Sequence, residues 1–268
     1  MKKLVLLFIV SYLVTSCQKE SQDSEKVTGL ITEKAMVVSA RVEASRIGTE
    51  ILKKGGNAFD AMMATELALA VTYPYAGNIG GGGFMVYRKN DGEIGALDYR
   101  EKAPLAATRD MYLDKEGNII KGKSTVGATA VGVPGTVAGV FKAQEKFGLL
   151  SVKEILSPVI ALAKKGVIVT KKQEDRIKKF KKAFETVNSK RILFLRDWKE
   201  GDIIKYKALA ITLERISKNG RDEFYKGKTA KVLAQFIQDN GGIITEEDLA
   251  KYEAKWRTPV TFEYDGLK

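Results

Sequence analysis

The segment from Ala58 to Val71 constrains the fold most, because it is apolar on nearly every side. Ala, Met and Leu dominate it, Asn57 precedes it, and Pro74 follows shortly after it. A helix that is apolar all round must be buried on all sides, so other elements must pack around this one. In a chain of 268 residues with 44% hydrophobic content, we therefore expect a globular fold built around a central helix.

The remaining pattern mixes helices and strands, which predicts an α+β fold. Strand-like stretches lie at residues 35–39, 84–88, 92–99 and 258–264, and helical stretches at 40–54, 136–147, 151–165, 209–219 and 228–240. Asn90-Asp91-Gly92 predicts a hairpin turn, and Thr245-Glu246-Glu247-Asp248 predicts a capped short helix. Asp265-Gly266 predicts a second hairpin turn, so we expect the polypeptide to continue beyond Lys268.

The net charge of +12 is concentrated in one stretch of the sequence. Residues 171–191 hold nine Lys or Arg against three Asp or Glu, while Ile177, Phe180 and Phe184 recur at helical spacing. This pattern is typical of a solvated amphipathic helix with a basic outer face. Since no nucleic-acid-binding motif accompanies the charge, we do not expect a nucleic-acid partner.

Histidine is absent, and there is a single cysteine. Their scarcity excludes Ser-His and Cys-His nucleophile pairs, zinc sites that use histidine, and an intramolecular disulfide within this chain. No metal or organic cofactor is indicated.

The N-terminus has the features of an export signal. Lys2 and Lys3 precede an apolar stretch from Leu4 to Val14, which is too short to span a bilayer. Val14-Thr15-Ser16-Cys17 resembles the lipobox of bacterial lipoproteins. We therefore expect residues 1–16 to be a lipoprotein signal peptide, Cys17 to be the lipid attachment point, and residues 17–34 to be a polar tether. The alternative is an ordinary signal peptide with a chance cysteine. The lipoprotein reading places the mature protein on the periplasmic face of a membrane.

Two features could contribute to a binding site, and each has a purely structural alternative. The run Gly80–Gly83 lacks the Lys-Ser/Thr of a phosphate loop. It also follows a predicted helix and precedes a predicted strand, whereas a dinucleotide-binding loop follows a strand and precedes a helix. It serves either as a tight backbone crossing or as the wall of a small-molecule pocket. Arg100, at the end of a predicted strand, either pairs with Asp98 or Glu101 or binds a carboxylate.

Seven segments, in this order and spacing, resemble the γ-glutamyltranspeptidase family over the chain from about Met36 onward. They are GGNAFDA (55–61), AVTYPYAGNIGGGGF (70–84), DYREKAP (98–104), VGVPGTVAG (131–139), DEFYKG (222–227), GGIIT (241–245) and RTP (257–259). The resemblance identifies residues 35–268 as the large-subunit region of such a protein, without its small subunit.

This resemblance implies an αββα sandwich of the N-terminal-nucleophile hydrolase type. Members of the family are made as one precursor, which cuts itself into two subunits. The N-terminal threonine of the small subunit attacks a γ-glutamyl amide, as in glutathione, and its own α-amine acts as the base. Water or an amino acid then accepts the γ-glutamyl group. The expected partners are therefore glutathione, an acceptor and the small subunit, besides the membrane that holds the lipid anchor.

By its place in the DYRE segment, the resemblance gives Arg100 the role of binding the α-carboxylate of the γ-glutamyl donor. No threonine here stands in the family's cleavage motif, so we expect no catalytic residue and no activity in this chain alone. Two alternatives stay open. One is a lipoprotein that keeps half the fold without catalysis, and the other is a relative that acts on poly-γ-glutamate or acyl side chains. Arg100 argues against acyl groups that lack an α-carboxylate.

Overall fold

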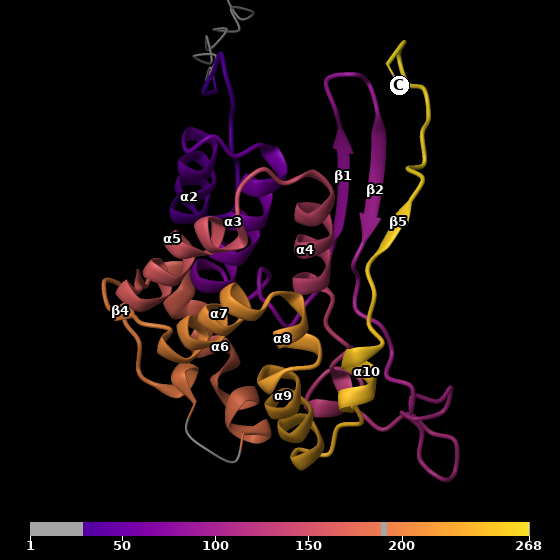
Figure 1. Ribbon diagram of the computed structural model, residues 1–268. Coiled ribbons are helices and arrows are strands. Elements are labelled where there is room, and N and C mark those ends of the chain that lie inside the picture. Colours follow the sequence, from indigo (N-terminus) through magenta and orange to yellow (C-terminus); the bar gives the residue numbers. More distant parts are fainter. Residues whose placement is uncertain (1–28, 189–191, 268) are drawn as a thin grey trace, which may run out of the picture. The chain divides into compact units, whose positions relative to one another are not determined.

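The computed structural model describes residues 29–188 and 192–267. The predicted signal peptide and Cys17 lie outside these residues, and of the predicted tether only 29–34 is described, with neither helix nor strand. The second of two units in the chain, residues 37–268, is compact. All elements below belong to the second unit (Figure 1).

This unit alternates helices with short strands. The helices are α2 (Val42–Lys53), α3 (Ala58–Thr72), α4 (Thr136–Phe147), α5 (Val152–Lys165), α6 (Lys171–Val187), α7 (Lys207–Asn219), α8 (Arg221–Tyr225), α9 (Lys228–Asp239) and α10 (Glu246–Ala250). The strands are β1 (Phe84–Arg88), β2 (Ile94–Asp98), β3 (Val167–Ile168), β4 (Ile203–Ile204) and β5 (Lys255–Arg257), and the 3-10 turns are η2 (Ala128–Ala130) and η3 (Leu193–Leu195). No helix in the described ranges is long and apolar enough to cross a membrane.

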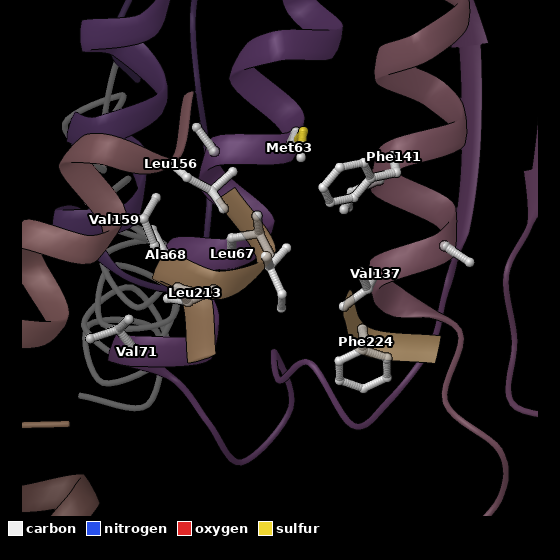
Figure 2. Close-up of a cluster of buried hydrophobic side chains, with 14 of the residues drawn as sticks. Met63, Leu67, Ala68, Val71, Val137, Phe141, Leu156, Val159, Leu213 and Phe224 are labelled. Carbon is white, nitrogen blue, oxygen red and sulfur yellow. The ribbon is translucent and has the colours of Figure 1, made fainter. Parts of the chain in front are cut away.

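Helix α3 is the central helix that the sequence predicts. Ten of its 15 residues are buried, and it packs against α2, α4 and α5. Leu67 of α3, Phe141 of α4, Leu156 of α5, Leu213 of α7 and Phe224 of α8 belong to one cluster of buried side chains (Figure 2).

The start of α3 is fixed by a capping box between Asn57 and Asp60. Asp60 is fully buried, and its carboxylate accepts hydrogen bonds from the backbone N–H groups of Asn57 (3.0 Å) and Leu149 (3.0 and 3.2 Å). One carboxylate therefore joins the first turn of α3 to the connection between α4 and α5.

The main sheet has the order β1-β2-β5, and both pairings are antiparallel, with Phe84 opposite Asp98. On one face, Met85 and Leu97 are buried, and a cluster of Phe59, Tyr87, Phe147 and Trp256 joins the sheet to α3 and α4. On the opposite face, the side chains of Phe84 and Val86 are exposed, at 67% and 73%. Within the described residues, this second face of the sheet is uncovered.

Two predicted strands are wrong. Residues 35–39 form no strand, since none of the described strands pairs with them. Residues 258–263 are also irregular, and the strand lies earlier, at Lys255–Arg257. Pro259 has no N–H to donate to a sheet ladder. The predicted turn at Asp265-Gly266 is confirmed, because both residues have positive φ and Tyr264 pairs with Leu267 across it.

The basic amphipathic helix predicted between residues 171 and 191 is confirmed as α6. Thr170 caps its start, and the Gln173 side chain returns the capping bond. Glu174, its one buried residue, pairs with Lys178 and accepts a hydrogen bond from the backbone N–H of Glu200 at 3.0 Å. These contacts hold the pKa of Glu174 at about 2, with the Lys178 hydrogen bond as the largest cause.

Candidate functional site

The glycine run passes close to the end of β2 and the start of α4. Gly83 and Tyr99 exchange backbone hydrogen bonds of 3.3 and 3.0 Å, and the carbonyl of Gly81 accepts from the N–H groups of Gly135 (2.7 Å) and Thr136 (3.0 Å). A Cβ on Gly82 would lie 2.4 Å from the carbonyl oxygen of Tyr99. Of the two readings of the glycine run, the tight backbone crossing is the one that this geometry supports.

Tyr99 is the residue that the glycines enclose. A Cβ on Gly135 would lie 1.9 Å from the Tyr99 carbonyl oxygen, and one on Gly139 would lie 2.2 Å from the Tyr99 ring. The Tyr99 side chain is 4% exposed, and burial, followed by the nearby charge of Glu66, raises its pKa. The close fit around Tyr99 fixes the backbone from which the next residue, Arg100, projects.

The backbone of Arg100 is held on both sides of its Cα. Its N–H donates to Asp98 Oδ1 at 3.1 Å, and its carbonyl accepts from the Tyr252 hydroxyl at 2.7 Å. Tyr252 itself is buried and stacks on Tyr225, with ring centroids 5.6 Å apart. Burial raises the pKa of Tyr252 to about 12. The hydroxyl therefore stays protonated at neutral pH and can donate the hydrogen bond to the Arg100 carbonyl.

The side chain of Arg100 is exposed, and it forms an ion pair with Glu101, one of the two partners that the sequence offered. It is 55% exposed, and its guanidinium lies 6.0 Å from the ring centroid of Phe84, on the uncovered face of the sheet. Its nearest carboxylate is that of Glu101, with Nη2 3.2 Å from Oε2. No geometrically acceptable hydrogen bond reaches Glu101 Oε2 from any described residue, although the atom is buried. Most of the planar donor set of Arg100 is therefore open to a ligand.

Asp98, the other predicted partner of Arg100, pairs instead with Arg257 on β5. Nη2 and Nε of Arg257 lie 2.9 and 3.2 Å from Asp98 Oδ2. The backbone N–H of Arg100 and then this pair lower the pKa of Asp98. The sequence placed Arg257 in a recognised segment but gave no sign of this partner, because 159 residues separate the two.

The turn before α4 is also held by a residue that is distant in the sequence. The Tyr225 hydroxyl donates to the carbonyl of Pro134 (3.0 Å) and accepts from the N–H of Ala138 (3.1 Å). Gly135, which supports Tyr99, lies between these two anchors. Helix α8 thereby fixes the element against which the Arg100 backbone is packed.

Chemically, an exposed guanidinium in this arrangement can bind an anion. The guanidinium of Arg100 matches a carboxylate in shape and charge. The described residues hold no cluster of three or more metal-ligating side chains. The exposed part of this guanidinium lies on the side of the uncovered sheet face, beside Phe84.

Comparison with known proteins assigns this arrangement to one family. Residues 44–268 match the family model described as gamma-glutamyltranspeptidase. The chain is 48% identical over 238 residues to the glutathione hydrolase proenzyme of Pseudomonas sp. (strain A14), and 46% identical over 244 residues to that of Escherichia coli (strain K12). These alignments cover 87% and 88% of this chain but 41% of each relative, so the chain spans less than half of their length.

The crystal structure of Helicobacter pylori gamma-glutamyltranspeptidase superimposes with a TM-score of 0.85 and 43% sequence identity. The superposition covers 88% of this chain and 69% of that chain. The elements around Arg100 therefore adopt the fold of that enzyme's chain.

Proposed function

This chain belongs to the γ-glutamyltranspeptidase family, and we propose that it supplies the donor-binding half of a γ-glutamyl transfer or hydrolysis site. The fold is the large-subunit part of the αββα sandwich of N-terminal-nucleophile hydrolases. The substrate class in this proposal is γ-glutamyl amides, with glutathione as the representative donor. Its support is the similarity to proteins named glutathione hydrolase.

One observation carries the proposal: Arg100 has a fixed backbone and an open guanidinium. A γ-glutamyl donor carries an α-carboxylate at the end remote from its scissile amide. Two parallel N–H···O bonds from Arg100 to that carboxylate would fix both the position and the rotation of the donor. Holding the donor in one orientation converts the attack on its γ-carbonyl into a step between pre-positioned groups.

In this proposal the chemical step belongs to the partner subunit. The hydroxyl oxygen of its N-terminal threonine adds to the γ-carbonyl carbon, while the α-amine of the same threonine takes the hydroxyl proton. The C–N bond then breaks, the leaving amine takes that proton, and an ester to the threonine remains. Water or an amino acid amine then displaces the γ-glutamyl group and restores the threonine.

The uncovered face of the β1-β2-β5 sheet suits such a partner. Phe84 and Val86 are exposed on this face, and an apolar patch that borders a polar site is typical of an interface. A second sheet packed on this face would lie on the same side as the Arg100 guanidinium. The layer that buries Phe84 and Val86 is therefore the one that would carry the nucleophile toward the donor.

Donor kinetics of the processed two-subunit protein test the role of Arg100. We expect Arg100→Lys to raise the KM for a γ-glutamyl anilide about 10- to 100-fold, since a lysine ammonium keeps the charge but loses the two-bond geometry, worth about 1.5–3 kcal/mol. Arg109→Lys is the matched control, because the Arg109 side chain is 95% exposed and pairs with the exposed Asp110. An unchanged KM in Arg100→Lys would refute the assignment.

We also propose that the mature chain is a lipoprotein held at the periplasmic face of a membrane through Cys17. The proposal rests on the lipobox-like sequence and on the polar stretch that follows it. Mass spectrometry of the purified mature protein should find a diacylated N-terminal Cys17, and Cys17→Ser should release the protein from the membrane fraction. An unmodified N-terminus at another residue would overturn the proposal.

A further inference from the structure

A cavity of about 760 Å³ lies beside the C-terminal end of α3, between that end, α6 and the segment from η3 to α7. Its volume is within the range of sites that hold small organic molecules. Most of its wall is apolar or aromatic. The lining residues are Ala40, Arg41, Tyr73, Pro74, Tyr75, Thr170, Lys172, Gln173, Arg176, Ile177, Phe180, Phe184, Phe194, Ile204 and Tyr206.

Contacts at both ends of α6 hold the cavity open. At the start of the helix, the Gln173 side chain donates to the carbonyl of Thr72, the last residue of α3, at 3.1 Å. Toward its end, Phe184 stacks on Phe194, with ring centroids 6.0 Å apart, and Phe194 packs on Tyr206 at 6.3 Å. Between these two contacts, Ile177 and Phe180 of α6 line the cavity, and Ile177 also packs against the hydrophobic core.

Arg176 is the polar group in this wall that lacks full hydrogen bonding. Its guanidinium carbon lies 3.4 Å from the ring centroid of Tyr75, so the two groups stack. Its Nη1 is buried and has no hydrogen-bond partner among the described residues. A buried donor without an acceptor is unfavourable, and an anionic group that entered the cavity would remove that deficit.

The charges of the lining favour an anion as well. Arg41, Lys172 and Arg176 contribute three positive charges, and none of the described lining residues is Asp or Glu. Arg41 already pairs with Glu43, at 3.0 Å. Lys172 and Arg176 form no salt bridge with any described residue. The cavity thus combines an aromatic wall with two cations free to meet a ligand.

We propose that this cavity binds an organic anion with an apolar body, such as an aromatic or branched carboxylate or sulfonate, with Arg176 as the contact for the anionic group. The aromatic side chains of α6, η3 and Tyr206 would hold the body, and Lys172 would add long-range attraction. This site does not depend on the proposed γ-glutamyl chemistry, because no residue of its wall belongs to the Arg100 site.

Two fluorescent probes with nearly the same body test the proposal on the full chain. 8-Anilino-1-naphthalenesulfonate carries the anionic group, and N-phenyl-1-naphthylamine lacks it. We expect one saturable site that binds the sulfonate about tenfold or more tightly than the neutral probe, as expected for one charge-assisted contact. Arg176→Gln should remove that preference while leaving the affinity for the neutral probe within about twofold, because the apolar wall is unchanged.

Lys182→Gln is the matched control. It removes one positive charge from the exposed side of the same helix, outside the cavity wall, and should leave both affinities unchanged. Equal binding of the two probes by the unmodified chain, or an unchanged sulfonate affinity in Arg176→Gln, would overturn the proposal. So would an equal loss in Lys182→Gln, since the preference would then reflect only the overall positive charge.

A second variant keeps the test decisive if Arg176→Gln fails to fold. The Phe180 side chain is 40% exposed, so Phe180→Ala should fold, yet it removes part of the aromatic wall. We expect it to weaken both probes by a similar factor of about three to ten. Unchanged affinity for both probes in this variant would show that they bind elsewhere and would refute the site.

Discussion

Replacing Gly82 with alanine should destabilise the protein much more than replacing Gly80, although both stand in the same glycine run. A Cβ on Gly82 would lie 2.4 Å from the carbonyl oxygen of Tyr99, 2.9 Å from the backbone nitrogen of Glu101 and 3.0 Å from the Cα of Arg100. All three are backbone atoms, which cannot rotate away as a side chain can. At Gly80 the nearest atom is Asn78 Oδ1, at 3.4 Å, which is an ordinary contact with a movable group.

The expected magnitude follows from this difference. Forcing one extra carbon into a packed position costs about 1–3 kcal/mol, and for a unit of this size 1 kcal/mol lowers Tm by about 2–4 °C. Gly82→Ala should therefore melt about 2–12 °C below the unmodified protein. Gly80→Ala should melt within about 2 °C of it, since alanine also restricts the unfolded chain.

Thermal unfolding followed by far-ultraviolet circular dichroism measures both variants under the same conditions. In the processed enzyme, Gly82→Ala should also raise the KM for a γ-glutamyl anilide, because the Tyr99–Glu101 backbone that carries Arg100 must move. Equal melting temperatures for the two variants would show that the glycine run is not a close backbone crossing, and the account of how Arg100 is positioned would fail.

Three further predictions concern Tyr252, the buried tyrosines and the activity of the isolated chain. Tyr252→Phe removes the 2.7 Å hydrogen bond to the Arg100 carbonyl. It should lower the free energy of unfolding in a urea titration by about 1–2 kcal/mol and raise the donor KM. If neither quantity changes, this bond does not position Arg100. Burial raises the pKa of Tyr206 and of Tyr252 to about 12, above the value of about 10 in an unfolded chain. The free energy of unfolding should therefore be constant below pH 10 and should fall as the pH rises from about 10 toward 12. Urea titrations across that range check this, and the fall should be shallower in Tyr252→Phe. Finally, purified residues 18–268 should show no turnover of a γ-glutamyl anilide, and measurable turnover would place a nucleophile within this chain.

The helices were predictable where local chemistry determines them. The mostly apolar α3, the Thr245 capping box and the bounds of α4 all follow from residues within one or two turns of each other. Strands depend on distant partners, and there the sequence was less informative. Strand-like residues at 258–264 form no ladder, while the three residues of β5 pair with β2, more than 150 positions away.

The same limit applies to the site. Arg100 was found because it stands in a recognisable local segment, and its exposure at the end of β2 agrees with the role proposed for it. Tyr252, which holds the backbone of Arg100, gave no local signal, and the segment that contains Arg257 gave no sign of its pairing with Asp98. Their contribution arises only when the chain brings β5 and the residues after α10 alongside β2.

The close packing around Tyr99 also limits which amino-acid substitutions this region can accept during evolution. At Gly139 the obstacle is the Tyr99 ring, so a larger residue there becomes acceptable if a smaller side chain replaces the tyrosine. At Gly82 and Gly135 the obstacle is the Tyr99 carbonyl oxygen, which every amino acid possesses. No second substitution at position 99 can therefore rescue the first at those two glycines. In a library that randomises all four positions, we expect Gly139 to vary together with residue 99, while Gly82 and Gly135 stay invariant among folded members.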